Sequence, residues 1–242
     1  MGFNYYRKVA DEQEELTNEE AGMIIKYNVI PTLAGGTFVF CAMMFLCMNL
    51  PLTMPYLVLS TVAYFALTIA TFVVSYRGNN NAAVVLFYGM CIATGWMSYP
   101  VLQWANLYLG SYIETVQLFA MAVLGATGVL IFMWIVVRAF PQTFNPSSGF
   151  VMKGMWVGMF LVIGLVMWTF VGFFFGFTLY LLVASLAGVL IGGLYTLIDY
   201  SLLHLRVRNG LWMFATARLT LDYFILILRI FMLLVLGRGF HK

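Results

Sequence analysis

The chain has 242 residues, of which 63% are hydrophobic and only 9% are charged. A soluble domain carries roughly 25% charged residues, so this composition excludes an ordinary soluble protein and indicates one that crosses a membrane several times. The formal net charge of +3 comes from scattered single basic residues, which excludes the basic patch of a nucleic-acid-binding protein.

Residues 1–26 are predicted to form a polar, acidic N-terminal arm, because six of the nine Asp and Glu residues lie there. The sequence from Thr17 to Glu20 is typical of a capping box, which predicts that a helix begins at this point. The residues before it are compatible with a short surface helix. Such an arm is a solvated segment or a docking surface for other membrane subunits.

Residues 27–242 are predicted to form an all-α transmembrane domain, a bundle of seven membrane-spanning helices. A spanning helix needs about 20 mainly apolar residues. Seven stretches of the sequence meet this requirement, at about 27–49, 54–76, 82–104, 114–137, 151–173, 177–200 and 213–236. The breaks between them are short, so no soluble domain is expected among the spans.

The distribution of Lys and Arg predicts the orientation of the bundle. Three connections carry no Lys or Arg, those after the first, third and fifth predicted spans. The N-terminal arm and the remaining connections carry the basic residues, which fits the positive-inside rule with the N-terminus inside. Arg238 and Lys242 at the opposite end are the exception. The expected location is the inner mitochondrial membrane or an endomembrane in a eukaryote, and the plasma membrane in a bacterium.

The last two predicted spans each contain an aspartate, Asp199 and Asp222. A carboxyl group inside a membrane costs at least about 2.5 kcal/mol at the bilayer centre, which makes it a candidate functional site. Spacings of 4 and 7 residues place Arg218, Asp222 and Arg229 on one helical face. This face cannot point at lipid, so we expect the seventh span to be central in the bundle.

The residue types alone leave two interpretations of these aspartates open. Two carboxyls in contact cannot both ionise cheaply and titrate as a pair, so with a mobile arginine they would form a proton-sensitive switch. Alternatively, a fixed ion pair such as Arg218 with Asp222 would serve only to hold the bundle together. The cysteines have no metal-ligand spacing, and no metal site or cofactor is expected.

Three segments resemble motifs of the Bax inhibitor family, the transmembrane Bax-inhibitor-motif proteins. Residues 193–199 (GLYTLID) are similar to the end of that family's sixth span, and residues 219–222 (LTLD) to its seventh. Residues 95–100 (GWMSYP) are similar to its third span, and in the same ungapped alignment Arg77 falls on an arginine of the second. Residues 223–228 depart from the family's Asn-Leu-Phe stretch, and Arg229 arrives about one turn early.

The resemblance implies that Asp199 and Asp222 form a pH-sensing pair and that Arg77 is a latch that binds Asp199. Arg218 and Arg229 are further candidate charge partners, because their spacing places them on one helical face with Asp222. The resemblance also implies a pH-dependent calcium leak and protection against cell death. Calcium would be a permeant ion and not a cofactor, because two carboxylates cannot supply the six to eight oxygens of a tight calcium site.

The predicted function is therefore a pH-sensitive cation leak or ion-homeostasis protein. The alternative is an accessory subunit of a larger membrane complex, which docks through its N-terminal arm or its aromatic faces and transports nothing. An enzyme is not expected. Intramembrane aspartyl proteases carry Gly-x-Gly-Asp at the second aspartate, whereas this chain has Leu-Thr-Leu before Asp222. A retinal-binding receptor needs a lysine in the seventh span, and this chain has none there.

Overall fold

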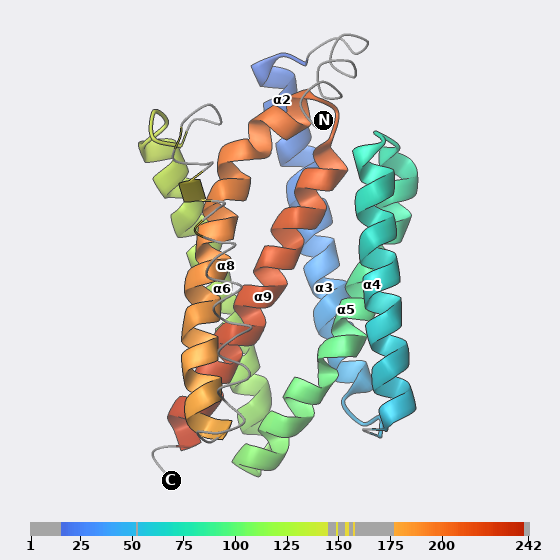
Figure 1. Cartoon of the computed structure of the whole chain (residues 1–242), viewed down its shortest axis with the longest axis vertical. Coiled ribbons are helices and arrows are strands. Elements are labelled where there is room, and N and C mark those ends of the chain that lie inside the picture. The colour runs from blue at the N-terminus through green and yellow to red at the C-terminus, as the bar shows by residue number, and fades with distance from the viewer. Residues whose placement is uncertain are drawn as a thin grey trace.

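A computed structural model describes residues 16–51, 53–144, 149, 153–154, 157 and 177–239. The elements defined within these ranges are all helical (Figure 1). They are α2 (Asn18–Ile24), the π-helix η1 (Ile25–Val29), α3 (Ile30–Cys47), α4 (Met54–Tyr76), α5 (Asn80–Leu109), α6 (Tyr112–Ala139), α8 (Phe177–Arg208) and α9 (Trp212–Gly239).

Six helices of the described part are long and apolar enough to cross a membrane. They match six of the seven predicted spans, and they support the prediction of an all-α, multi-pass membrane protein. The remaining predicted span, 151–173, lies outside the described residues except for positions 153, 154 and 157.

The first membrane helix begins at Asn18, nine residues before the predicted start of the first span. Its capping box is present as predicted: the Glu20 carboxylate accepts from the Thr17 backbone N–H at 2.9 Å, and Thr17 Oγ1 accepts from the Glu20 N–H at 3.3 Å. The helix continues through the wider π-helical turn of η1 into α3 without a break. One helix of 30 residues therefore joins the end of the N-terminal arm to the first span.

Side-chain contacts define the two ends of the bundle. At the N-terminal end, Asn80 donates to the carbonyl of Gly210 at 3.0 Å, and Arg208 donates to the carbonyl of Leu16 at 3.2 Å. At the opposite end, Arg238 near the end of α9 pairs with Glu114 at the start of α6 at 3.3 Å. Helices α6 and α9 are therefore antiparallel, and so are α8 and α9, which are joined by a short turn. It follows that α6 and α8 run in the same direction.

Helix α9 is the centre of the described bundle, in line with the prediction for this span. It contacts η1, α3, α4, α5, α6 and α8, and Figure 1 shows it running obliquely between α8 on one side and α3 and α4 on the other. Phe224 stacks on Phe40 of α3 with ring centroids 4.0 Å apart, and the Tyr223 hydroxyl lies 2.6 Å from the hydroxyl of Thr127 of α6.

Small residues at four-residue spacing on α8 let α9 approach closely. A Cβ on Gly188 would lie 2.7 Å from Arg229 Cδ, and one on Gly192 would lie 3.1 Å from Leu226 Cδ2. The glycines therefore serve packing within this chain, as small residues do in membrane helix pairs.

Gly95 of α5 lies directly against the backbone of α3, and this contact carries a first prediction. A Cβ at this position would lie 2.6 Å from the backbone oxygen of Phe40 and 2.9 Å from Met43 Cβ. Backbone cannot rotate out of the way as a side chain can. We expect Gly95→Ala to destabilise the bundle by about 1–3 kcal/mol, measured by thermal unfolding in detergent.

The matched control for this substitution is Gly125→Ala in α6, where the added Cβ would meet Ile230 at an ordinary 3.6 Å. We expect it to leave the unfolding temperature close to that of the unchanged chain. Equal unfolding temperatures for the two variants would contradict the close crossing at Gly95.

Candidate functional site

The two aspartates lie at matching depths because α8 is longer than the sequence predicted. The sixth span was expected to end at residue 200, but α8 continues to Arg208. Asp199 then lies nine residues before the end of α8, and Asp222 lies ten residues after the start of α9. At 1.5 Å per residue these are about 14 and 15 Å from the connecting turn. The longer helix removes the mismatch in depth between the two carboxyls.

Asp199 is fully buried and pairs with two arginines. Its Oδ1 accepts from Arg206 Nη1 at 2.8 Å, and its Oδ2 accepts from Arg218 Nε at 3.0 Å. Arg206 lies two turns further along α8, whereas Arg218 comes from α9. The carboxylate therefore bridges the two helices, and each of its oxygens has a charged donor.

Asp222 is 8% exposed and lies close enough to Asp199 for the two carboxyls to act on each other. No described residue makes a hydrogen bond with its buried Oδ2. Two carboxyl groups make a favourable hydrogen bond only when one of them carries a proton. We call the four side chains Asp199, Asp222, Arg206 and Arg218 the Asp–Arg cluster; its two carboxyls would need a proton between them to form a favourable hydrogen bond.

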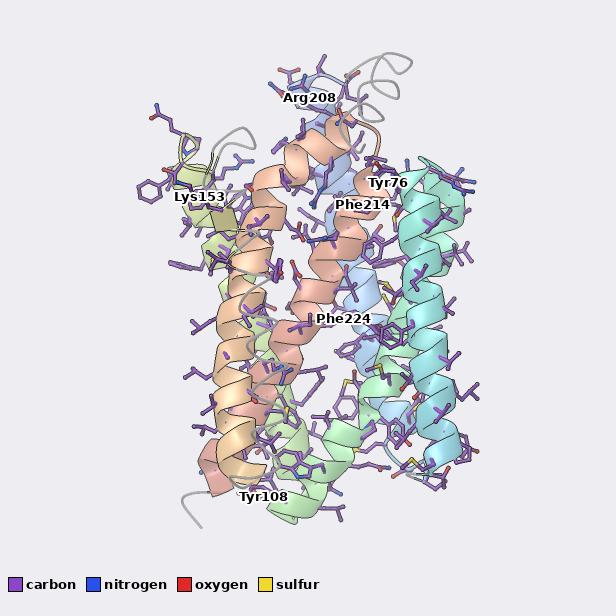
Figure 2. The ribbon with its side chains drawn as sticks, in the orientation of Figure 1. Tyr76, Tyr108, Lys153, Arg208, Phe214 and Phe224 are labelled. Atoms are coloured by element: carbon purple, nitrogen blue, oxygen red, sulfur yellow. The ribbon has the colours of Figure 1, made fainter. Side chains whose placement is uncertain are left out.

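Arg77, the predicted latch, lies outside this cluster. It is the C-cap residue of α4, and its side chain is exposed. It lines a cavity of about 320 Å³ together with Phe214 and Tyr76, which are labelled in Figure 2. The centres of these two rings lie 6.0 Å apart. The guanidinium of Arg206 lies 5.5 Å from the centre of the Phe214 ring. Phe214 is thus a neighbour of both Arg77 and the Asp–Arg cluster.

The other two arginines named from the sequence have different positions. Arg218 was considered as a fixed partner of Asp222, but its hydrogen bond goes to Asp199, while its charge also acts on Asp222. Arg229 lies on the same face of α9, two turns beyond Asp222, and packs against Gly188 of α8. The structure therefore brings Asp199, Asp222 and Arg218 together and places Arg229 further along the α8–α9 contact.

Arg206 is the member of the cluster that the sequence did not reveal. The sequence places Arg206 in the connection between the last two predicted spans, where its charge serves only to predict the orientation of the chain in the membrane. The available signal was its spacing of seven residues from Asp199, which places the two side chains on one helical face. That signal has meaning only if the helix continues past residue 200.

The described residues contain no group of three or more His, Cys, Asp or Glu side chains that could hold a metal ion. The chemistry of the Asp–Arg cluster is instead that of charge pairing and proton binding. Buried ion pairs are costly to form, and removing one partner from such a pair is more costly still. The cluster can thus hold α8 against α9.

The helices and the cluster define a multi-pass α-helical membrane protein with ionisable groups buried between its last two helices. Comparison of the chain with protein-family models, with curated proteins and with solved structures finds no match. The resemblance to the Bax inhibitor family therefore rests on the three short motifs and Arg77 alone.

Proposed function

We propose that the chain is a proton-responsive cation leak protein, with calcium as the permeant ion. The observation that supports this function is the contact between Asp222 and Asp199 at the centre of the bundle. Carboxyl groups inside a membrane are costly and typically mark ion or proton pathways. Two carboxylates are too few to store calcium, so an ion that reaches them would pass through.

In this proposal a proton on Asp222 sets the state of the cluster. When Asp222 is protonated, it donates to Asp199, and the two helices stay together. When the proton leaves, two carboxylates are in contact, and they repel each other unless the arginines rearrange. Arg77 would enter at this point as the latch, since Phe214 lines the cavity of Arg77 and also lies against Arg206.

The proposal includes seven membrane crossings with the N-terminus on the positive-inside face. Because α6 and α8 run in the same direction, the chain between them has to return from one end of the bundle to the other. Gly154 supports this path at its start, since a Cβ there would lie 3.4 Å from Ile198 of α8. Apart from Arg238, the described Lys and Arg residues outside the interior of the bundle lie near its N-terminal end. This distribution also fits the positive-inside rule.

Calcium flux into proteoliposomes, measured across a range of pH, tests the proposed function. An asparagine at position 222 cannot titrate and resembles the protonated aspartate in shape and hydrogen bonding. We therefore expect Asp222→Asn to show, at every pH, the flux that the unchanged chain shows at acidic pH. The control is Glu114→Gln, which removes a carboxylate at the far end of the bundle and should keep the pH dependence.

Two results would contradict this function. The first is a calcium flux no greater than that of empty liposomes at any pH. The second is an Asp222→Asn variant with the same pH profile as the unchanged chain.

A second candidate is a structural subunit of a larger membrane assembly, without transport. The observation that favours it is the pairing of both Asp199 oxygens with arginines, which is the arrangement of a fixed internal ion pair. Native purification separates the two functions. A stoichiometric complex with other chains and no flux supports the subunit, whereas a lone protein with pH-dependent flux supports the leak.

A further inference from the structure

We propose that a groove between the first membrane helix and α6 binds one acyl chain of an anionic phospholipid, whose headgroup lies against Arg138 and His204. The groove is independent of the Asp–Arg cluster and of the leak function. It consists of two adjoining cavities, one apolar and one basic, that open on the side of the bundle.

The apolar cavity has a volume of about 400 Å³, within the range of roughly 300–1,000 Å³ typical of ligand pockets. Its walls come from η1 and α3 on one side and from α6 on the other, while α8 and α9 form its floor. Val29, Leu33, Leu130, Leu203 and Leu219 give it an almost wholly apolar lining. The widened turn of η1 contributes Ile25 and Val29 to this wall.

The basic cavity continues the groove toward the N-terminal end of the bundle. It shares Ile25, Trp134, Tyr200 and Leu203 with the apolar cavity and adds Gly22, Arg138 and His204. The guanidinium of Arg138 lies 4.9 Å from the centre of the Trp134 ring, which positions it over the groove. Gly22 has no side chain, and a Cβ there would meet no atom of the described residues within 4 Å, so none of these residues closes the basic end at this position.

The length of the groove matches one leaflet of a membrane. Along α6 it extends from Thr127 to Arg138, eleven residues or about 16 Å at 1.5 Å per residue. Half of the hydrocarbon core of a bilayer is about 15 Å. The basic end then lies where the apolar core gives way to headgroups, the depth at which Trp and Arg side chains are common.

The cross-section of the groove selects a lipid chain over a protein helix. The two cavities together, of about 400 and about 90 Å³, spread over about 16 Å, leave a cross-section of about 30 Å². This area accommodates a single hydrocarbon chain. A helix with its side chains is about 10 Å across and needs more than twice that area. The positive charge of Arg138 favours a negative headgroup over a neutral one.

The test is lipid retention in nanodiscs made of phosphatidylcholine with a minor fraction of phosphatidylglycerol. The protein is extracted into mild detergent, and the lipids that stay bound are counted by native mass spectrometry. We expect the unchanged chain to retain one lipid and to enrich phosphatidylglycerol over its share of the membrane. Arg138→Gln should reduce that enrichment about fivefold, the effect of one surface cation on an anionic lipid.

A second variant fills the groove itself. Ile25 lines both cavities, so Ile25→Trp should displace the retained lipid of either kind. Its control is Ile69→Trp, which adds the same ring on the lipid-facing side of α4, where Ile69 is 61% exposed. The control for charge is Arg77→Gln, at the same end of the bundle but outside the groove. Both controls should retain lipid as the unchanged chain does, and thermal unfolding verifies that all four variants fold.

Three outcomes would overturn the proposal. The first is retention of the two lipids in proportion to the membrane, or equal enrichment in Arg138→Gln. The second is an undiminished retained lipid in folded Ile25→Trp. The third is a protein chain that co-purifies with the unchanged protein and is displaced by Ile25→Trp, which would assign the groove to a partner helix.

Discussion

Asp199→Asn is expected to destabilise the bundle by about 3–5 kcal/mol, the usual cost of removing one partner from a buried ion pair. The substitution keeps the shape of the side chain but removes the charge that Arg206 and Arg218 share. Asp199 is fully buried and the Arg206 and Arg218 side chains are 15% and 35% exposed, so water replaces the lost carboxylate only in part. The expected result is a large drop in unfolding temperature in detergent, together with a lower yield of folded protein.

The neighbouring carboxyl provides the comparison for this prediction. Asp222→Asn is expected to change stability by no more than about 1 kcal/mol, because the new amide donates to Asp199 without needing a proton. The two substitutions are chemically identical and lie in contact with each other. If Asp222→Asn were as damaging as Asp199→Asn, the assignment of the arginine pairs to Asp199 would be wrong.

Arg218→Met is expected to cost about 2 kcal/mol, less than the loss of Asp199, because the Arg218 side chain is 35% exposed. Methionine keeps the apolar length of the side chain and removes only the charged end. Asp199 then keeps Arg206 alone, and the cluster holds one carboxyl more than it has guanidinium groups. Unfolding in a denaturing detergent, followed by circular dichroism, measures the change.

A double variant tests whether this loss is one of charge balance. Arg218→Met combined with Asp222→Asn again has one possible negative charge and one positive charge. We expect it to recover part of the stability lost in Arg218→Met, because residues of one network do not contribute additively. The control is Arg238→Met, which breaks the exposed pair with Glu114 and should cost no more than about 1 kcal/mol. A cost for Arg218→Met no larger than that of the control would contradict the pairing.

Much of the fold could be predicted from single features of the sequence. Long apolar stretches locate the described membrane helices. For the majority of helix ends, the predicted and observed positions differ by only a few residues. The capping box at Thr17 identifies the start of the first helix. Gly110 and Gly210, which adopt left-handed backbone angles of φ 69° and 70°, lie at two of the turns. These features are local, because each depends on the composition or backbone preference of a few neighbouring residues.

The candidate site could be predicted only in part. Asp199 and Asp222 can be identified as site residues from the sequence, because a carboxyl group inside a membrane is energetically costly. Helical spacing then identifies Arg218 as a residue on the same face as Asp222. Choosing between Arg77, Arg206, Arg218 and Arg229 as partners requires the distances between helices. Arg206 was overlooked because apolar residues thin out after residue 200, although the helix continues for two more turns.

The amino-acid sequence alone is enough to predict an all-helical membrane protein with two costly carboxyl groups in its last two helices. Each spanning helix satisfies its own backbone hydrogen bonds and needs apolar side chains toward lipid, so it can be recognised from its own stretch of sequence. The packing of the helices is needed to show that Asp199 pairs with Arg206 and Arg218, that Arg77 lies outside this cluster, and that a groove remains beside η1 and α6. Ion pairs and cavities depend on where separate helices meet, and no pattern within a single helix records that.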